Sequence, residues 1–522
     1  MSSPTRSAAA SPEPLRLDGQ PLTIADVLAV AREGRPVELG PAARQRMEAA
    51  RRVVDARCGG GEAIYGVNTG FGSLSRVRIQ PDDVREVQRN LVRSHAAGVG
   101  EPLPDDAVRA MMVVAAASLS RGRSGVRPIV VETICTFLNR SLTPVVPSRG
   151  SVGASGDLAP LAHMALALIG EGRSMLAGET LPTSVFTISR DIAPLVLEAK
   201  EGLALINGTH FMSSTAALLL ADLDRVQGAA LVAAAMAIDA CRATDAFLDP
   251  RLHEVRRQPG QVAVAARLRE LLAGSRILPS HKEDDPRVQD PYCLRAMPQV
   301  LGAAFDALAY LRGAIERELG AVTDNPLVFA PDAGGATLHS LGDLVSGGNF
   351  HGMPLAIPLD AAAIAMTHLA GIAERRVNWL LTAGDPQNPV PAYLSPKPGL
   401  HSGLMIAQYT AAACVNEMMT LAAPASVGNI PTSAGIEDYN SMGATAALKA
   451  TRALGLLRSV VAIELLVMTE AMEYQRPLTS GTAIEKAIAA VREVVPKLTA
   501  DRPPAPDIAA IERLIASGRL GV

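Results

Sequence analysis

Long stretches of alanine and leucine, interrupted by single charged residues, fill much of the second half of the chain. Three stretches share this pattern: 215–238, 354–373 and 402–425. The interrupting side chains include Asp222, Arg225, Asp360 and Glu417, which argues against membrane spans. Segments that are apolar around most of their circumference are typical of buried helices, here packed in an oligomer. We therefore predict a bundle of long helices over 211–522.

Shorter elements with recognisable end signals precede these stretches. Thr23 and Asp26 have the spacing of a capping box, which predicts the start of a helix. A second predicted helix covers 158–169, where Asp157 suits the N-cap position and Pro160 suits the first turn. The fold class that follows is mainly α, with a smaller N-terminal domain over 15–210 beside the bundle. Residues 1–14 are rich in Ser, Ala and Pro and lack an apolar signal-peptide core, so we expect a disordered tail.

Composition narrows the functional classes. The 522-residue chain has a formal net charge of −3 and no basic stripe, so nucleic acid is not an expected partner. Its five cysteines form no Cys-x-x-Cys pair and its nine histidines form no His-Glu-x-x-His motif. That distribution argues against a disulfide framework and a zinc site, and it fits a reducing, cytoplasmic location. No membrane partner is expected either.

The segment Gly150–Asp157, which reads Gly-Ser-Val-Gly-Ala-Ser-Gly-Asp, carries the most specific chemical signal. One interpretation is a glycine turn that leads into the following helix. The other is chemical: in a tight turn the Gly156 amide nitrogen can reach the Ala154 carbonyl carbon, because glycine has no side chain in the way. Cyclisation with loss of two water molecules, one of them from the Ser155 hydroxyl, would give an electrophilic 4-methylidene-imidazol-5-one ring.

The longer stretch 150–163 resembles the signature of the aromatic amino acid ammonia-lyases and aminomutases. Further blocks follow the family's order, and the pair Ser94-His95 is similar to the histidine ammonia-lyase branch. The resemblance implies an almost wholly helical homotetramer whose sites draw residues from more than one chain. It also implies no metal and no external cofactor, because the ring forms autocatalytically from Ala154-Ser155-Gly156, with Ser155 as its dehydroalanine part.

The resemblance also assigns roles to individual residues. Tyr65 and Tyr292 are expected to be catalytic, and Tyr65 would remove the β-proton of the substrate. To act as a base at neutral pH, a phenol needs its pKa of about 10 lowered by nearby positive charge or dipoles. Arg295 would clamp the α-carboxylate, since a planar guanidinium can pair with both oxygens. The expected substrate-binding residues are Ser94, His95, Asn207, Gln289, Arg295, Phe350 and Glu417.

The expected reaction is elimination of ammonia from a small aromatic amino acid, with L-histidine to trans-urocanate as the first choice. Residues 416–419 and 435–440 depart from the histidine branch, and His95 could bond an imidazole or a phenol. The alternatives are therefore tyrosine, phenylalanine or a modified histidine as the substrate, and an aminomutase that adds the ammonia back. A catalytically silent helical scaffold is a further alternative, which the intact Ala154-Ser155-Gly156 argues against.

Overall fold

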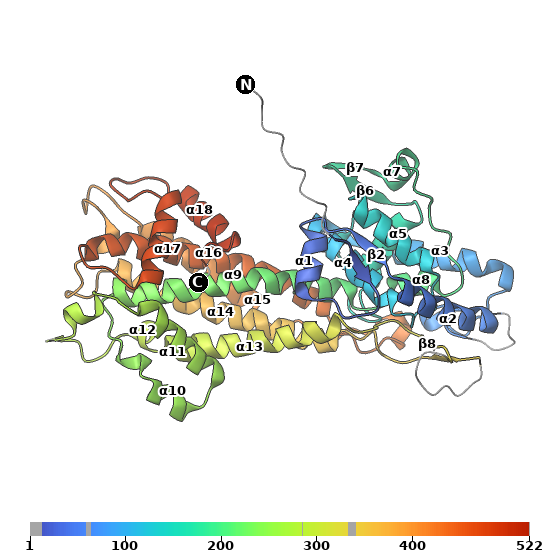
Figure 1. Ribbon diagram of the computed structural model, residues 1–522, viewed down its shortest axis with the longest axis horizontal. Coiled ribbons are helices and arrows are strands. Elements are labelled where there is room, and N and C mark those ends of the chain that lie inside the picture. Colours follow the sequence, from blue (N-terminus) through green and yellow to red (C-terminus); the bar gives the residue numbers. More distant parts are fainter. Residues whose placement is uncertain (1–12, 59–63, 284, 332–340, 521–522) are drawn as a thin grey trace, which may run out of the picture. The chain divides into compact units, whose positions relative to one another are not determined.

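The computed structural model describes residues 13–58, 64–283, 285–331 and 341–520. Eighteen α-helices and nine short strands lie within these ranges, which confirms the mainly α fold class. Of the predicted tail, residues 1–12 lie outside the described residues. The described chain packs into two compact units (Figure 1).

Each unit is assembled from three segments of the chain. Unit 1 comprises the described part of Met1–Leu218 together with Ala314–Ile357 and Ala425–Ala447. Unit 2 comprises Leu219–Gly313, Pro358–Pro424 and the described part of Leu448–Val522. The domain boundary predicted between residues 210 and 211 stays a prediction, because packing units and folding domains need not coincide.

Unit 1 combines short helices with all the strands of the described chain. Its helices are α1 (Ile24–Ala31), α2 (Pro41–Cys58), α3 (Val84–His95), α4 (Asp105–Ser120), α5 (Pro128–Asn139), α6 (Leu158–Leu168), α7 (Thr183–Ser189) and α8 (Glu201–Ile206). Its strands are β1 (Leu15–Leu17), β2 (Val37–Leu39), β3 (Val99–Pro102), β4 (Thr143–Pro144), β5 (Pro147–Arg149), β6 (Arg173–Leu176), β7 (Glu179–Pro182), β8 (Leu327–Phe329) and β9 (Asp343–Val345). The parallel pair is β1–β2, and the antiparallel sheets are β3–β5, β4–β6–β7 and β8–β9.

Local sequence signals explain several of these helices. Thr23 Oγ1 accepts a hydrogen bond from the Asp26 amide, and the Asp26 carboxylate accepts one from the Thr23 amide, so the predicted capping box is confirmed at the start of α1. The predicted helix over 158–169 is confirmed as α6. At the centre of unit 1, α4 is buried from Ala107 to its end, and its Arg109 guanidinium donates to three backbone carbonyls.

Unit 2 is a bundle built around long helices. It holds most of α9 (His210–Ala240), α13 (Met297–Glu318), α14 (Met353–Leu381) and α16 (Gly443–Met472). The shorter helices are α10 (Pro250–Arg256), α11 (Pro259–Leu272), α12 (Tyr292–Arg295), α15 (Met405–Leu421), α17 (Thr482–Val494) and α18 (Ala505–Ala516). The predicted stretches 215–238 and 354–373 lie within α9 and α14, and the stretch 402–425 contains the shorter α15.

Polar contacts between the long helices show how unit 2 is packed. Arg376 of α14 pairs with Glu464 of α16 at 2.5 Å, and both side chains are buried. Thr469 of α16 lies 3.7 Å from the Met236 sulfur of α9. Among the described residues, α14 alone is long and apolar enough to cross a membrane, and 67% of its most apolar window is buried inside the protein. A buried core helix passes the same test.

Candidate functional site

The Gly150–Asp157 turn lies against the backbone of Gly208. The Gly208 amide donates to the Ser155 carbonyl oxygen at 3.2 Å, and the Asp157 amide donates to the Gly208 carbonyl oxygen at 2.8 Å. Gly156 has a φ of +77°, and a Cβ at this position would lie 2.1 Å from the Gly208 oxygen. Glycine is therefore required at position 156 by both conformation and space.

The opposite side of the turn meets a second backbone segment. The Met442 amide donates to the Val152 carbonyl oxygen at 3.0 Å, and Ser441 Oγ donates to the Gly153 carbonyl oxygen at 3.3 Å. A Cβ at Gly153 would lie 2.0 Å from the Ser441 hydroxyl. The turn is thus held on two sides, with a glycine at each closest approach.

The side chain of Asp157 binds a different helix from the one that the sequence suggested. Its carboxylate makes no cap hydrogen bond to α6. Instead, Oδ2 accepts hydrogen bonds from the amides of Phe211 at 3.1 Å and Met212 at 2.9 Å, in the first turn of α9. Oδ1 accepts one from Ser151 Oγ at 3.0 Å. Asp157 therefore occupies the predicted N-cap position of α6, while its buried carboxylate satisfies the free amides of α9 and ties α9 to the turn.

The burial of Asp157 predicts a dependence of stability on pH. Burial raises the pKa of this carboxyl from 3.8 to about 7, although its three hydrogen bonds lower it. Between about pH 4 and pH 7 the folded chain therefore holds a proton that the unfolded chain has released, so stability should fall as pH rises. The substitution Asp157→Asn removes this proton and keeps an acceptor for the α9 amides.

As the pH rises over this range, we expect the unfolding free energy of Asp157→Asn to fall less steeply than that of the wild type. The difference between the two slopes corresponds to up to about one bound proton per chain. Urea unfolding at a series of pH values measures both slopes. Other titrating groups affect the two proteins alike, so the difference isolates Asp157. Equal slopes would show that the carboxyl does not hold the proton.

Tyr65 lies in the loop between α2 and α3. Its ring packs edge-on against Phe71, with centroids 6.3 Å apart, and its hydroxyl oxygen accepts a hydrogen bond from the Gly72 amide at 3.4 Å. Burial raises the pKa of the phenol above 10 and the Glu437 carboxylate raises it further, while the Gly72 amide lowers it. The net direction is opposite to the lowering expected for a base at neutral pH, so a single chain does not supply that activation.

Ser94 and His95 end helix α3. His95 Nδ1 lies 2.9 Å from the Leu91 carbonyl oxygen and 3.1 Å from Ser94 Oγ. Burial lowers the pKa of the imidazole, while the bond to Leu91 and the charge of Glu437 raise it. A carbonyl oxygen can only accept, so in the neutral ring Nδ1 carries the proton and Nε2 is an acceptor. His95 can therefore receive an N–H or an O–H donor.

Glu437 is a charged group that sequence reasoning missed. Its carboxylate acts on the pKa of both Tyr65 and His95, which places all three in one neighbourhood of unit 1. Glu437 follows the 3₁₀ turn Ser433–Gly435, and Ser433 Oγ accepts a hydrogen bond from the Ser73 amide of the Tyr65 loop at 3.2 Å. The sequence signal that could have identified it is an acidic residue within 435–440, the block that also departs from the histidine branch.

Phe350 lies beside the same part of unit 1. It is half-buried and directly precedes His351, whose Nε2 lies 2.9 Å from the Tyr439 carbonyl oxygen. The His351 ring also stacks on the Tyr439 ring, with centroids 6.5 Å apart. The segment 433–443 therefore contacts the Tyr65 loop, the Gly150–Asp157 turn and the Phe350 block.

Asn207 closes α8 and directly precedes Gly208. Its side chain is buried, and Nδ2 donates to Asp324 Oδ1 at 3.2 Å and to the Asn325 carbonyl oxygen at 3.1 Å. Within the described residues, Asn207 Oδ1 is a buried acceptor without a partner.

Unit 1 holds eight of the predicted site residues: Tyr65, Ser94, His95, Ala154, Ser155, Gly156, Asn207 and Phe350.

Three other predicted residues line one cavity of unit 2. Gln289, Tyr292 and Arg295 border a cavity of about 500 Å³. Arg295 Nε donates to the Asp290 carbonyl oxygen at 2.9 Å, and the guanidinium carbon lies 4.3 Å from the centre of the Tyr292 ring. The terminal Nη groups of Arg295 make no hydrogen bond within the described ranges, which leaves a fork suited to a carboxylate. The Tyr292 side chain is 71% exposed.

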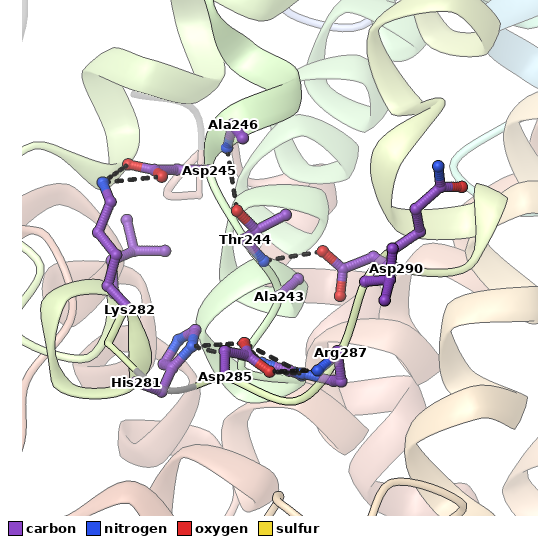
Figure 2. Close-up of a pocket in the computed structure, with 12 residues that line it drawn as sticks. Ala243, Thr244, Asp245, Ala246, His281, Lys282, Asp285, Arg287 and Asp290 are labelled. Carbon is purple, nitrogen blue, oxygen red and sulfur yellow. Dashed lines mark hydrogen bonds and ion pairs between the residues drawn. The ribbon is translucent and has the colours of Figure 1, made fainter.

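Arg287 anchors the segment that leads to these three residues (Figure 2). Its guanidinium donates to Asp385 Oδ2 at 2.8 Å and to Asp285 Oδ2 at 2.6 Å, and it also reaches the carbonyl oxygens of Cys241 and Arg242 beyond the end of α9. The acidic side chains hold the pKa of Arg287 well above its usual range. Arg287 and Asp285 also line a second cavity, of about 400 Å³.

The Arg287 contacts predict how a substitution would act. Arg287→Met leaves two carboxylates and two carbonyls without their donor, so the segment 285–295 should open more often. We expect its backbone amides to exchange with deuterium at least about tenfold faster, the equivalent of about 1.4 kcal/mol and within the range for charged hydrogen bonds. Arg251→Met, which removes an exposed ion pair of the same unit, serves as the control. Unchanged exchange at 285–295 would contradict the anchoring role.

Glu417 lies on α15 in an exposed ion pair. Arg452 Nε donates to its Oε1 at 2.8 Å, and this hydrogen bond lowers the pKa of the carboxyl. The Glu417 carboxylate, which lies in an apolar stretch, therefore has an arginine of α16 as its partner.

Within the described residues, no group of three or more His, Cys, Asp or Glu side chains is arranged to hold a metal ion, and all five cysteines are free thiols.

Comparison with known proteins identifies the family of the chain. The family model described as aromatic amino acid lyase matches residues 22–493. A histidine ammonia-lyase of Sorangium cellulosum (strain So ce56) is 48% identical over 96% of this chain and 97% of its own. The crystal structure of histidine ammonia-lyase from Trypanosoma cruzi has a TM-score of 0.88 at 37% identity and covers 97% of this chain and 94% of its own. A tyrosine aminomutase from Streptomyces globisporus has a TM-score of 0.88 at 35% identity, with 97% and 98% covered. The chain belongs to the aromatic amino acid lyase family.

Proposed function

We propose that this protein is a carbon–nitrogen lyase that eliminates ammonia from L-histidine to give trans-urocanate. The observation that carries the proposal is the Ala154-Ser155-Gly156 turn, held in close backbone contact with Gly208. A turn that only connects two elements has no need of an Ala-Ser-Gly sequence with a buried glycine packed against a carbonyl. The similarity to histidine ammonia-lyases along nearly the whole chain supports the choice of substrate.

The residues of the turn fit the prosthetic ring that we propose forms there. Gly156 has the close packing and left-handed φ that a tight turn needs, and the unpartnered Asn207 Oδ1 lies one residue before Gly208. Once formed, the ring would supply an electrophilic methylene carbon that makes the substrate nitrogen a better leaving group. No external cofactor is part of the proposal.

The side chains of the chain would bind the substrate and move its proton. Arg295 would hold the α-carboxylate with its open fork, and Gln289 and Tyr292 would border it. The phenolic oxygen of Tyr65 would take the β-proton. Because burial keeps the Tyr65 phenol protonated in a single chain, its activation has to come from groups that approach on assembly. Holding the base and the amine in register would supply much of the rate.

The preference for histidine would come from the surroundings of His95. Its Nε2 can accept the single N–H of a neutral imidazole, and the Glu437 carboxylate can accept the second N–H of a protonated ring. Ser94 and the ring of Phe350 would border the same side chain. Glu417, expected there by resemblance, is paired with Arg452, so we favour Glu437 for this role.

We propose that the enzyme works as a homotetramer with sites shared between chains. In a single chain, helix α15 buries one stripe of residues: Ala407, Ala411, Val415 and Met418. Three large apolar residues outside that stripe, Ile406, Tyr409 and Met419, are more than half exposed. A face of this kind suits a second copy of the chain. A cytoplasmic location is part of the proposal and agrees with the free thiols.

Incubation with single amino acids tests the function. Purified protein with L-histidine should release ammonia and form urocanate, followed by its ultraviolet absorbance, faster than it forms the unsaturated products of L-tyrosine or L-phenylalanine. Product chromatography separates a lyase from an aminomutase, since the latter yields a β-amino acid. Turnover of tyrosine or phenylalanine alone would replace histidine as the substrate, and a β-amino acid as the main product would replace elimination.

A further inference from the structure

Helix α8 is fastened at both ends to one carboxylate. Lys200, which precedes the helix, places Nζ 2.6 Å from Asp324 Oδ2. Asn207, which follows it, places Nδ2 3.2 Å from Asp324 Oδ1. All three side chains are buried, with exposures of 0%, 2% and 2% for Lys200, Asp324 and Asn207. From this arrangement we infer that Lys200 and Asp324 are positioning residues that fix the Asn207 amide against the Ala154-Ser155-Gly156 turn.

The inference rests on the proposed function and on the expected role of Asn207 in binding the substrate. It extends that function to two residues that would touch neither the substrate nor the ring. They would act through Asn207 alone, so their effect should be seen in the rate of the chemical step and in the position of one amide.

The contacts of Asp324 decide which way the Asn207 amide faces. A carboxylate and a backbone carbonyl can only accept hydrogen bonds, and Nδ2 of Asn207 points at both Asp324 Oδ1 and the Asn325 carbonyl oxygen. The NH₂ group is therefore committed to this side. Oδ1 must face the other way, where it is buried without a partner in the described chain and is available to a donor.

Neighbouring bonds keep the whole Asn207–Thr209 turn against the same segment. The Thr209 amide donates to Thr323 Oγ1 at 3.2 Å, next to Asp324 in the sequence. The Gly208 amide donates to the Ser155 carbonyl oxygen. A displacement of Asp324 would therefore reach the Ala154-Ser155-Gly156 turn through one short piece of backbone.

Lys200 is placed for this contact by an uncommon backbone conformation. Its φ of +70° lies in the left-handed region, which residues with a Cβ rarely adopt. The conformation directs a fully buried ammonium to Asp324 Oδ2, where it balances the charge of the carboxylate. Without that cation, the buried carboxylate would lack its charged partner, and the orientation of Asn207 would lose its support.

Asp324→Asn is the sharpest single substitution because it keeps shape and removes one acceptor. The carboxylate serves Lys200 through one oxygen and serves Asn207 and the Asn325 amide through the other. Lys200 and Asn207 lie at different oxygens of the carboxylate, and an amide at position 324 has only one oxygen, so in this geometry it can accept from one of the two donors but not from both. We expect Lys200, as the charged donor, to take that oxygen, and the NH₂ of the new amide then confronts the NH₂ of Asn207.

The expected result is a loss in kcat with little change in KM. A misplaced group of this kind costs about 100-fold in rate, and Arg295 should still bind the carboxylate, so KM should change less than about threefold. The peptide that contains residues 154–156 should still show the loss of two water molecules, and a crystal structure of Asp324→Asn should show the Asn207 amide turned or displaced. Arg109→Met is the control, because it removes a buried cation of unit 1 whose hydrogen bonds do not involve Asn207. This variant should lose stability, but at temperatures below its unfolding transition it should keep the kcat of the wild type.

The double variant Lys200→Met with Asp324→Asn separates positioning from general damage. With no ammonium at position 200, the amide oxygen at position 324 is free to accept from Asn207 again. We expect kcat to recover at least about tenfold relative to Asp324→Asn alone, the non-additivity that coupled residues show. A merely structural pair predicts a double variant no better than the single one.

Three outcomes would overturn the inference. The first is a kcat for Asp324→Asn within about threefold of wild type. The second is a loss of kcat in Arg109→Met equal to that in Asp324→Asn. The third is a loss of kcat in Asp324→Asn that matches the loss of the dehydrated form of the peptide with residues 154–156. The last would mean that the pair serves ring formation and not Asn207. Failure of the proposed function looks different: the wild type itself would leave L-histidine unchanged, and the crystal structure of the variant would still report whether the Asn207 amide had moved.

Discussion

Ser155→Ala is expected to abolish turnover while the protein still folds. The Ser155 hydroxyl would leave as the second water, so alanine at this position cannot give the exocyclic methylene carbon. Loss of a group on which the chemistry depends lowers kcat by at least about a thousandfold. Folding should survive, because the Ser155 side chain is half-buried and makes no hydrogen bond within the described ranges.

Ser151→Ala is the matched control for this variant. It removes a hydroxyl from the same turn, and with it only the bonds from Ser151 Oγ to Asp157 and Gly156 and from the Gly153 amide. We expect it to keep kcat within about tenfold of wild type, because a hydrogen bond of this kind contributes about 1 kcal/mol. Initial rates of urocanate formation compare the two. Normal turnover by Ser155→Ala would remove the ring from the account.

Tyr65→Phe is the second substitution with a large expected effect. It keeps the ring that packs on Phe71 and deletes the oxygen that would take the β-proton. A positioned general base contributes about 10²- to 10⁴-fold, so kcat should fall by that factor, with KM changed far less. The exposed Tyr310→Phe on α13 controls for the loss of a phenol elsewhere. Turnover by Tyr65→Phe close to wild type would mean that another group is the base.

The dependence of activity on protein concentration supplies a second measurement on Tyr65. In the single chain, burial and Glu437 favour the protonated phenol, which is the inactive form of a base. Assembly therefore has to shift the equilibrium, and dilution below the assembly concentration should lower activity faster than it lowers the amount of folded protein. Specific activity that is independent of concentration, in a protein shown by light scattering to be monomeric, would contradict shared sites.

Local sequence signals predicted the elements whose causes are local. The capping box at Thr23 and Asp26, the helix from Leu158 and the long Ala- and Leu-rich helices depend on residues within a few positions of one another. The Gly150–Asp157 turn was also readable, because its small residues are contiguous. In these places composition and spacing contain most of the physical information.

Contacts between distant segments were out of reach of the same reasoning. Lys200 and Asp324 are 124 positions apart, and they pair because the residue before α8 lies against the segment before β8. Glu437 reaches Tyr65 and His95 only because 433–435 folds against the Tyr65 loop. Asp157 has a good N-cap sequence for α6, but the amides that it binds belong to α9. Each case depends on a tertiary contact that no local pattern encodes.

The mass of one peptide shows directly whether Ala154-Ser155-Gly156 forms the ring. Protease digestion of the purified wild type, followed by mass spectrometry, gives the mass of the fragment that contains residues 150–157. We expect a fragment lighter than its sequence by two water molecules, with the change confined to Ala154-Ser155-Gly156. A fragment of unmodified mass in a preparation that converts L-histidine to urocanate would contradict this expectation, since the reaction would then proceed without the ring.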